Sequence, residues 1–222
     1  MTTVPPKTPP TAVVPREMRW WDIDAVLALE KELFPDDAWS RGMFWSELAH
    51  ARGPGSSRRY LVAYEGDRLV GYGGLAVAGT DSDGGAAVAA DVQTIAVARD
   101  HWGTGLGACL LTELLRHATA FEATEVMLEV RVDNTRAQKL YQRFGFEPIG
   151  FRRGYYQPGN VDALVMRLSD PSAVPDCAVS GTTGDGADAT DTADAADSTT
   201  DSTTEGRNAG PLNGVQGTGI HG

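Results

Sequence analysis

The chain has little of several features that define other classes of protein. Its 222 residues include only two cysteines, Cys109 and Cys177, and neither has a neighbouring metal-ligand residue. No run of eighteen or more apolar residues is long enough to cross a membrane, and the N-terminus lacks the basic and apolar regions of a signal peptide. We therefore expect a cytoplasmic protein that binds neither a membrane nor a metal ion.

Positive charge is also scarce. The formal net charge is −11, and residues 170–222 contribute −8 of it, so the rest of the chain is only mildly acidic at −3. A chain without a basic excess is a poor candidate for direct nucleic-acid binding, which requires a basic surface. The same charge is compatible with a basic peptide or protein as a partner.

Composition divides the chain into three parts. Proline and threonine are frequent in residues 1–12, while glycine, alanine, threonine, serine and aspartate dominate residues 171–222. We predict that both ends are disordered, because they offer few large apolar side chains to bury. Residues 13–170 form one expected domain, and a domain of roughly this size buries about 70% of its unfolded surface without disulfides.

Apolar periodicity predicts the element order βααβββαβαββ within this domain. Asp22 and Ser40 are the expected N-caps of the first two helices, and residues 79–85 are an expected loop. The expected strands are 13–20, 60–64, 69–77, 88–97, 125–132, 146–155 and 161–168, and the expected helices are 22–34, 40–48, 106–121 and 135–144.

The segment QTIAVARDHWGTGLG, residues 93–107, joins a strand to a helix through a glycine-rich loop. Gly103, Gly105 and Gly107 have no Cβ, so the backbone can turn tightly and bring its N–H groups against an anion. The helix that begins at Leu106 adds unpaired amides and a positive dipole end. The segment therefore predicts a phosphate-binding site.

Three other interpretations of this loop are possible. Gly103, Gly105 and Ala108 also fit the spacing of a dinucleotide-binding turn, with Glu125 and Glu129 about twenty residues later. The loop, however, lies in mid-domain and too little chain follows it for a second nucleotide-binding half. No Gly-Lys-Ser/Thr follows, which excludes a P-loop. A turn that merely packs a helix on a strand remains an alternative.

The segment LEVRVDNTRAQKLYQRFGFEPIGFRRGYYQPGNVDALVM, together with the strand and glycine loop, closely resembles the GCN5-related N-acetyltransferases (GNATs), and among them the RimI type. The resemblance covers residues 13–168. It implies an α/β (α+β) fold with a mixed central sheet splayed between strands four and five and helices on both faces. Trp102 departs from the pattern, because the family usually has glutamine or arginine at the loop's first position.

The resemblance also implies acetyl-CoA as co-substrate. The pantetheine arm is expected between strands four and five, the pyrophosphate at the glycine loop, and a further contact at the start of the next helix. The expected cofactor-binding residues are Ile95, Ala96, Val97, Gly103, Thr104, Gly105, Leu106, Gly107, Ala108 and Asn134.

Catalysis requires a neutral amine to attack a thioester. Glu129 matches the family's general base and Tyr141 its general acid, although Glu129 could instead pair with Arg131, and Tyr141 could be an ordinary helix aromatic. Tyr155 and Tyr156 match a pair that clasps the N-terminus of a peptide. Strand alternation makes mutual packing of these two rings the less expected alternative. Phe34 and Trp39 are further candidate substrate contacts, or else local core residues.

We expect an N-terminal protein acetyltransferase, and the RimI resemblance implies as substrate the N-terminal alanine of the eighteenth small-subunit ribosomal protein, a basic protein. One alternative is acetylation of lysine side chains or a small-molecule amine. Lysine side chains have a pKa near 10.4 against about 7.7–8.0 for an α-amine, so they demand more from a base. The other alternative is a noncatalytic acyl-CoA-binding module whose acidic tail recruits a partner. The sequence gives no oligomeric state.

Overall fold

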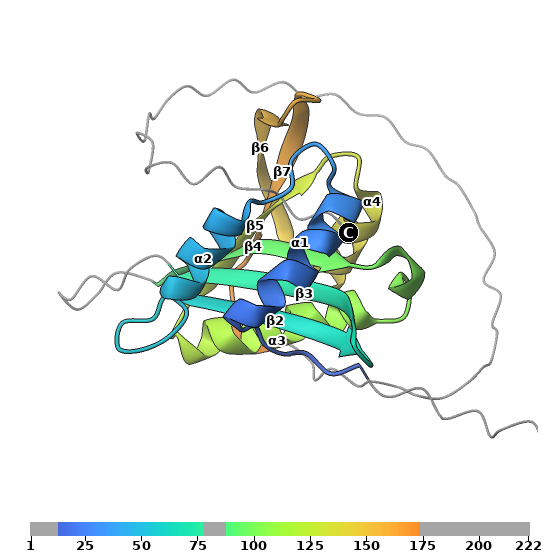
Figure 1. The fold of residues 1–222 in the computed structure, drawn as a ribbon. Helices are drawn as coiled ribbons and strands as arrows, with labels where there is room; N and C mark the ends of the chain where they lie inside the picture. The colour runs from blue at the N-terminus through green and yellow to red at the C-terminus, as the bar shows by residue number, and fades with distance from the viewer. Residues whose placement is uncertain (1–12, 78–87, 174–222) are drawn as a thin grey trace, which may run out of the picture. The chain divides into compact units, whose positions relative to one another are not determined.

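The computed structural model describes residues 13–77 and 88–173. The predictions for residues 1–12, for the loop at 79–85 and for residues 174–222 lie outside this part of the chain. The described elements follow the predicted order, with three short 3-10 helices added (Figure 1). They are β1 Arg16–Glu17, η1 Trp20–Asp22, α1 Ile23–Leu33, α2 Arg41–Ala49, β2 Arg58–Glu65, β3 Arg68–Val77, β4 Ala89–Val97, η2 Arg99–His101, α3 Leu106–Ala120, β5 Glu125–Arg131, α4 Thr135–Arg143, β6 Glu147–Tyr156, β7 Val161–Leu168 and η3 Pro171–Ala173.

The strands form one seven-stranded sheet in the order β1-β2-β3-β4-β5-β7-β6. β4 and β5 pair in parallel, and the other neighbouring strands pair antiparallel. The helix α3 makes the crossover that a parallel pair requires. This mixed sheet confirms the expected architecture. It also rules out the dinucleotide-binding alternative, which requires a doubly wound parallel sheet.

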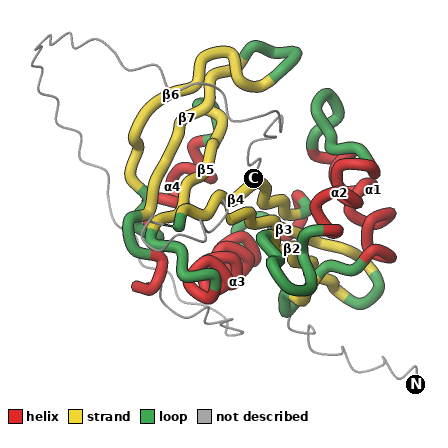
Figure 2. The backbone as a smooth tube through the Cα atoms, turned by 90° about the vertical axis from the view of Figure 1, so that its left-hand side faces the viewer, coloured by secondary structure: helices red, strands yellow, loops and turns green. Residues whose placement is uncertain are grey.

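Helices cover both faces of the sheet, and β3 shows how the sequence arranges this (Figure 2). Positions where Gly71 and Gly73 would carry a Cβ lie within 3.1–3.2 Å of leucine side chains of α3, so α3 packs close to the backbone there. Tyr72 points to the opposite face, where its hydroxyl donates to Glu30 of α1. Because side chains alternate between the two faces of a strand, the glycines of β3 let α3 pack closely on one face, while Tyr72 contacts α1 on the other.

The sheet opens between β4 and β5. Their pairing runs only from Ala89 opposite Glu125 to Val92 opposite Leu128, although both strands continue beyond it. A register shift against β3 falls at the same place, since Val92 pairs with Leu75 and Thr94 with Gly74, which leaves Gln93 as an extra residue. A β-bulge of this kind bends its strand, so it accounts for the divergence. The predicted splay is confirmed.

Two details at the N-terminal end of the domain differ from the prediction. The first strand has only two residues rather than the eight of 13–20, because the chain turns into η1 at Trp20. The Asp22 side chain does not cap α1. Its carboxylate is engaged by Arg16 at 2.7 Å and accepts the Arg19 N–H at 2.8 Å instead. The predicted cap at Ser40 is confirmed, since its Oγ accepts the N–H of Met43 at 3.3 Å.

Within residues 13–77 and 88–173, no helix is both long and apolar enough to span a membrane.

Candidate active site

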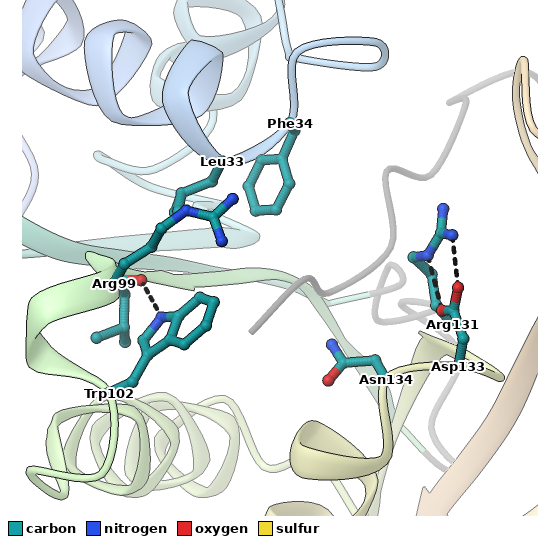
Figure 3. Close-up of a pocket in the computed structure, with 8 residues that line it drawn as sticks. Leu33, Phe34, Arg99, Trp102, Arg131, Asp133 and Asn134 are labelled. Atoms are coloured by element: carbon teal, nitrogen blue, oxygen red, sulfur yellow. Dashed lines mark hydrogen bonds and ion pairs between the residues drawn. The ribbon is translucent and has the colours of Figure 1, made fainter.

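A cavity of about 470 Å³ lies where β4 and β5 have separated (Figure 3). One wall comes from the end of β4 and the residues after it, the other from the end of β5 and the start of α4, and the end of α1 closes the site. The lining residues are Leu33, Phe34, Val97, Arg99, Trp102, Arg131, Asp133 and Asn134.

Beyond the bulge, β4 pairs only with β3 among the described residues. The edge of residues 95–97 that faces β5 thus has no strand beside it among the described residues, so an extended ligand can add there as a strand would, although the Val97 carbonyl already accepts a hydrogen bond from Trp102. The side chains of these three residues are buried, so the strand edge is held rigidly. This geometry fits the amide-containing arm of acetyl-CoA.

The glycine loop lies directly beyond this edge. Gly103 and Gly105 have φ angles of 79° and 90°, a conformation that other residues rarely adopt, and no atom lies within 4 Å of where their Cβ would be. Gly105 is the N-cap residue of α3, and its carbonyl accepts the N–H of Cys109 at 3.0 Å. The first amides of α3, from Leu106 to Ala108, have no partner within the helix. Open space in front of amides at a positive helix end fits a pyrophosphate group.

Trp102, which stands where the family usually has glutamine or arginine, has a definite structural role. Its Nε1–H donates to the Val97 carbonyl at 2.8 Å, which ties the loop to the end of β4 (Figure 3). The guanidinium of Arg136 lies 3.5 Å from the indole ring centre, and that of Arg99 lies 5.2 Å from it. Burial lowers the pKa of Arg136 from its usual value, with the charge of Arg99 as the second cause. Two cations beside the α3 amides make this wall of the cavity favourable for phosphate.

Asn134 forms the opposite edge of the cavity. It is the N-cap of α4, and its Oδ1 accepts the N–H of Ala137 at 3.1 Å. Because the cap uses the carboxamide oxygen, the amide nitrogen is the group left to meet a ligand.

Glu129 lies on β5 just past the last β4–β5 pair, where the strands separate. Its side chain is 14% exposed, and Arg152 of β6 lies 3.0 Å from its Oε1. Burial raises the pKa of Glu129 from its usual value, and the charge of Arg152 opposes that shift. The alternative pairing with Arg131 is wrong, because Arg131 binds Asp133 at 2.8 and 2.9 Å. Glu129 is therefore a partly desolvated carboxylate with a raised proton affinity.

The two hairpin tyrosines contact each other, contrary to the alternation argument. The rings of Tyr155 and Tyr156 meet edge to face with centres 5.1 Å apart. Gly154, with φ 56°, and a register shift between Arg152 and Tyr156 break the strand alternation here. Burial raises the pKa of Tyr155 to about 12, and the charge of Glu129 adds to the shift. Burial also raises the pKa of Tyr156 well above its usual value, so both tyrosines are neutral hydrogen-bonding groups near Glu129.

Tyr141 is 1% exposed on α4 and packs its ring against Phe146, with centres 5.9 Å apart. Burial raises its pKa well above the usual value, so the hydroxyl keeps its proton at neutral pH. Tyr141 also contributes to the raised pKa of Tyr156, although burial is the main cause of that shift. The location suits a proton donor, and it equally suits a core aromatic.

The two candidate substrate aromatics separate in the structure. Phe34 lines the cavity, whereas Trp39 is 3% exposed and packs against Phe44 and Tyr60 with ring centres 5.2 and 6.4 Å away. Only Phe34 is in a position to contact a ligand in the cavity directly. Four further residues line the cavity, and nothing in their local sequence pattern distinguishes them from ordinary surface or helix residues: Leu33, Arg99, Arg131 and Asp133.

Comparisons with known proteins agree with this geometry. The model of the Acetyltransferase (GNAT) family matches residues 23–146. A Bacillus subtilis protein provisionally named [ribosomal protein bS18]-alanine N-acetyltransferase is 33% identical over 156 residues, which are 70% of this chain and 95% of that protein. The N-alpha-acetyltransferase RimI of Mycobacterium tuberculosis is 38% identical over 154 residues, 68% of this chain and 90% of the relative.

Among solved structures, the ribosomal-protein-S18-alanine N-acetyltransferase of Escherichia coli superposes with a TM-score of 0.57 at 24% identity, covering 70% of this chain and 92% of that one. The likeness supports the fold. The family match and the two relatives together show that the chain belongs to the GNAT acetyltransferase family and is an acetyl-CoA-dependent N-acetyltransferase.

Proposed function

We propose that this enzyme acetylates the free α-amine of proteins, and that its substrate is the N-terminal alanine of the basic ribosomal protein bS18. The observation that carries the proposal is the tyrosine clasp, by which we mean Tyr155 and Tyr156, beside the partly buried Glu129. The names of the two relatives support the substrate.

The tyrosine clasp restricts which amine can approach. Tyr156 is 3% exposed, and its hydroxyl donates to the backbone carbonyl of Glu129 at 3.4 Å, so the β6–β7 hairpin is held against β5. Arg152 lies over the Tyr155 ring, 5.4 Å from its centre, and also contacts Glu129. A chain end can enter beside such a closed hairpin, whereas a lysine in mid-chain must bring peptide on both sides of it.

The proton balance favours the same substrate. Acetyl-CoA supplies an acetyl group as a thioester, and the amine must be neutral to attack it. An α-amine with a pKa of about 7.7–8.0 is roughly 10–20% neutral at pH 7, whereas a lysine amine is only about 0.04% neutral. Glu129 accepts a proton from the α-ammonium at a carboxylate oxygen, directly or through one water. As the C–S bond breaks, Tyr141, kept protonated by burial, donates from its hydroxyl to the departing thiolate, and the second proton that the nitrogen loses when the amide forms balances the one that Tyr141 gives.

A peptide competition tests the proposal. The full chain is given acetyl-CoA and a peptide that begins with alanine, continues with basic residues and contains one internal lysine. We expect acetylation of the α-amine at least about tenfold faster than of the lysine, a barrier difference near 1.4 kcal/mol. Mass spectrometry locates the acetyl group. Label that accumulates on lysine while the α-amine stays free would refute the proposal.

Variants of the clasp separate its shape from its hydroxyl groups. Tyr155→Ala removes the ring over which Arg152, the partner of Glu129, lies, so we expect a rise in peptide KM and little change in the KM for acetyl-CoA. Tyr155→Phe, the matched control, keeps the ring and the edge-to-face contact. A panel of peptides with different first residues then defines how strongly alanine is preferred.

A further inference from the structure

A second carboxylate, Asp91, lies on the same side of the sheet as Glu129. Asp91 of β4 is the pairing partner of Met127 on β5, and Glu129 is two residues beyond Met127. Side chains two residues apart leave a strand on the same face, and the strand spacing places the two Cβ atoms about 8 Å from each other. Two carboxylates therefore flank the point where β4 and β5 separate.

Asp91 is partly exposed, but one of its two carboxylate oxygens is not satisfied by its surroundings. Its Oδ1 is shielded from solvent and has no hydrogen-bond partner among the described residues. A buried carboxylate oxygen without a partner is costly, and such groups occur where function requires them. The isosteric asparagine would avoid a buried charge at this position, so the carboxylate calls for an explanation.

Of the two carboxylates, Glu129 has an arginine in direct contact, whereas the arginines near Asp91 act on it from a greater distance. Arg152 of β6 contacts Glu129 at 3.0 Å. Arg58 of β2 is held by Glu47 of α2 at 2.8 Å, and the two arginines act on Asp91 only as more distant charges. Also facing this region are the phenols of Tyr60 on β2, hydrogen-bonded to Gln93 at 2.6 Å, and of Tyr155 and Tyr156 on β6.

We propose that Asp91 is a positioning residue whose charge acts through space on Glu129, one strand away on the same face of the sheet, and that it thereby sets the strength of the base that deprotonates the substrate amine. The proposal rests on the assignment of Glu129 as that base. The proton leaves the α-ammonium nitrogen and binds a Glu129 oxygen, and the charge of Asp91 determines how firmly Glu129 holds it.

The direction of the pKa shifts agrees with this geometry. Burial raises the pKa of Asp91 to about 7, and the charge of Glu129 is the second cause. Two interacting carboxylates lose their protons in two steps that belong to the pair. Burial also raises the pKa of Glu129, so both shifts move the carboxylates towards the pKa of an α-amine, the match that an efficient general base requires. Without Asp91, Glu129 would face Arg152 alone and would be a weaker base.

The pH dependence of turnover tests this role of Asp91. The full chain is assayed with saturating acetyl-CoA and an alanine-initiated peptide between about pH 5.5 and 9, as wild type, Asp91→Asn, Asp91→Glu and Glu129→Gln. For Asp91→Asn we expect the acidic limb of kcat to move to lower pH by about one unit and the plateau to fall about three- to tenfold. Asp91→Glu should restore the wild-type limb, which a purely structural role would not predict.

Each outcome is decisive for one claim. If the kcat–pH profile of Asp91→Asn coincides with that of the wild type while Glu129→Gln is inactive, the role proposed for Asp91 is refuted, and Glu129 is still supported as the base. If Glu129→Gln keeps full turnover, the base itself is wrong. Carbon-13 NMR of the aspartate carboxyls gives a reading that does not depend on activity. Asp91 should titrate near pH 7 in wild type and at lower pH in Glu129→Gln, and a midpoint below about pH 5 in wild type would overturn the proposal.

Discussion

The two faces of β4 and β5 differ sharply in chemistry. Towards α3, side chains such as Val92, Leu128 and Val130 are almost completely buried and apolar. The opposite face presents Asp91 and Glu129, both with raised pKa values. One face supplies the burial that stabilises the domain and the other holds groups whose burial is unfavourable. The free energy gained by burying the apolar face must therefore exceed the cost of burying the two carboxylates on the other face.

The largest expected effect comes from changing the polar face. Glu129→Gln keeps the shape of the side chain and removes its basicity, so we expect kcat to fall by about 10² to 10⁴ while acetyl-CoA binding is nearly unchanged. The melting temperature should stay the same or rise, because a buried charge is removed. Steady-state kinetics at pH 7 and 9 with a melting curve check this. Wild-type kcat at pH 7 in the folded variant would contradict it.

The apolar face should respond in the opposite way. Leu114 of α3 is fully buried and packs against the backbone at Gly73, so Leu114→Ala should cost about 2–5 kcal/mol of unfolding free energy. For a domain of this size each kcal/mol lowers the melting temperature by roughly 2–4 °C. Well below the melting temperature, kcat per folded molecule should change less than about threefold. A loss of kcat comparable to that of Glu129→Gln would show that the two faces are not separable.

The smallest effect is expected at the glycine loop, which connects β4 to α3 and belongs to neither face of the sheet. Gly105→Ala places a Cβ in a left-handed conformation and in front of the α3 amides, so we expect the KM for acetyl-CoA to rise about three- to tenfold. Gly66→Ala is the matched control, because Gly66 has φ 59° and open space around it but lies in the β2–β3 turn. Both variants should lose similar stability. Equal KM values in the two would exclude a phosphate contact at Gly105.

The sequence was sufficient to predict the order of the elements, since the periodicities of β5 and α3 are visible without any partner. It was not sufficient where one residue's environment depends on a distant one. Asp91 lies in an alternating strand and looks like a solvent-facing residue, and the partner of Glu129 proved to be Arg152 on another strand rather than Arg131. The contact between Tyr155 and Tyr156 required a break in alternation that local pattern does not reveal.

The bulge at Gln93 also limits how this part of the protein can evolve. Before it, Ala90 and Val92 are the buried residues of β4 beside the partly buried Asp91, whereas after it Ile95 lies at the Gly73 position that faces α3. The extra residue therefore switches which positions of the strand face α3. Deletion of a single residue here would turn either the carboxylate or Ile95 to the wrong face. β4 should consequently tolerate many substitutions across homologues while its length stays fixed.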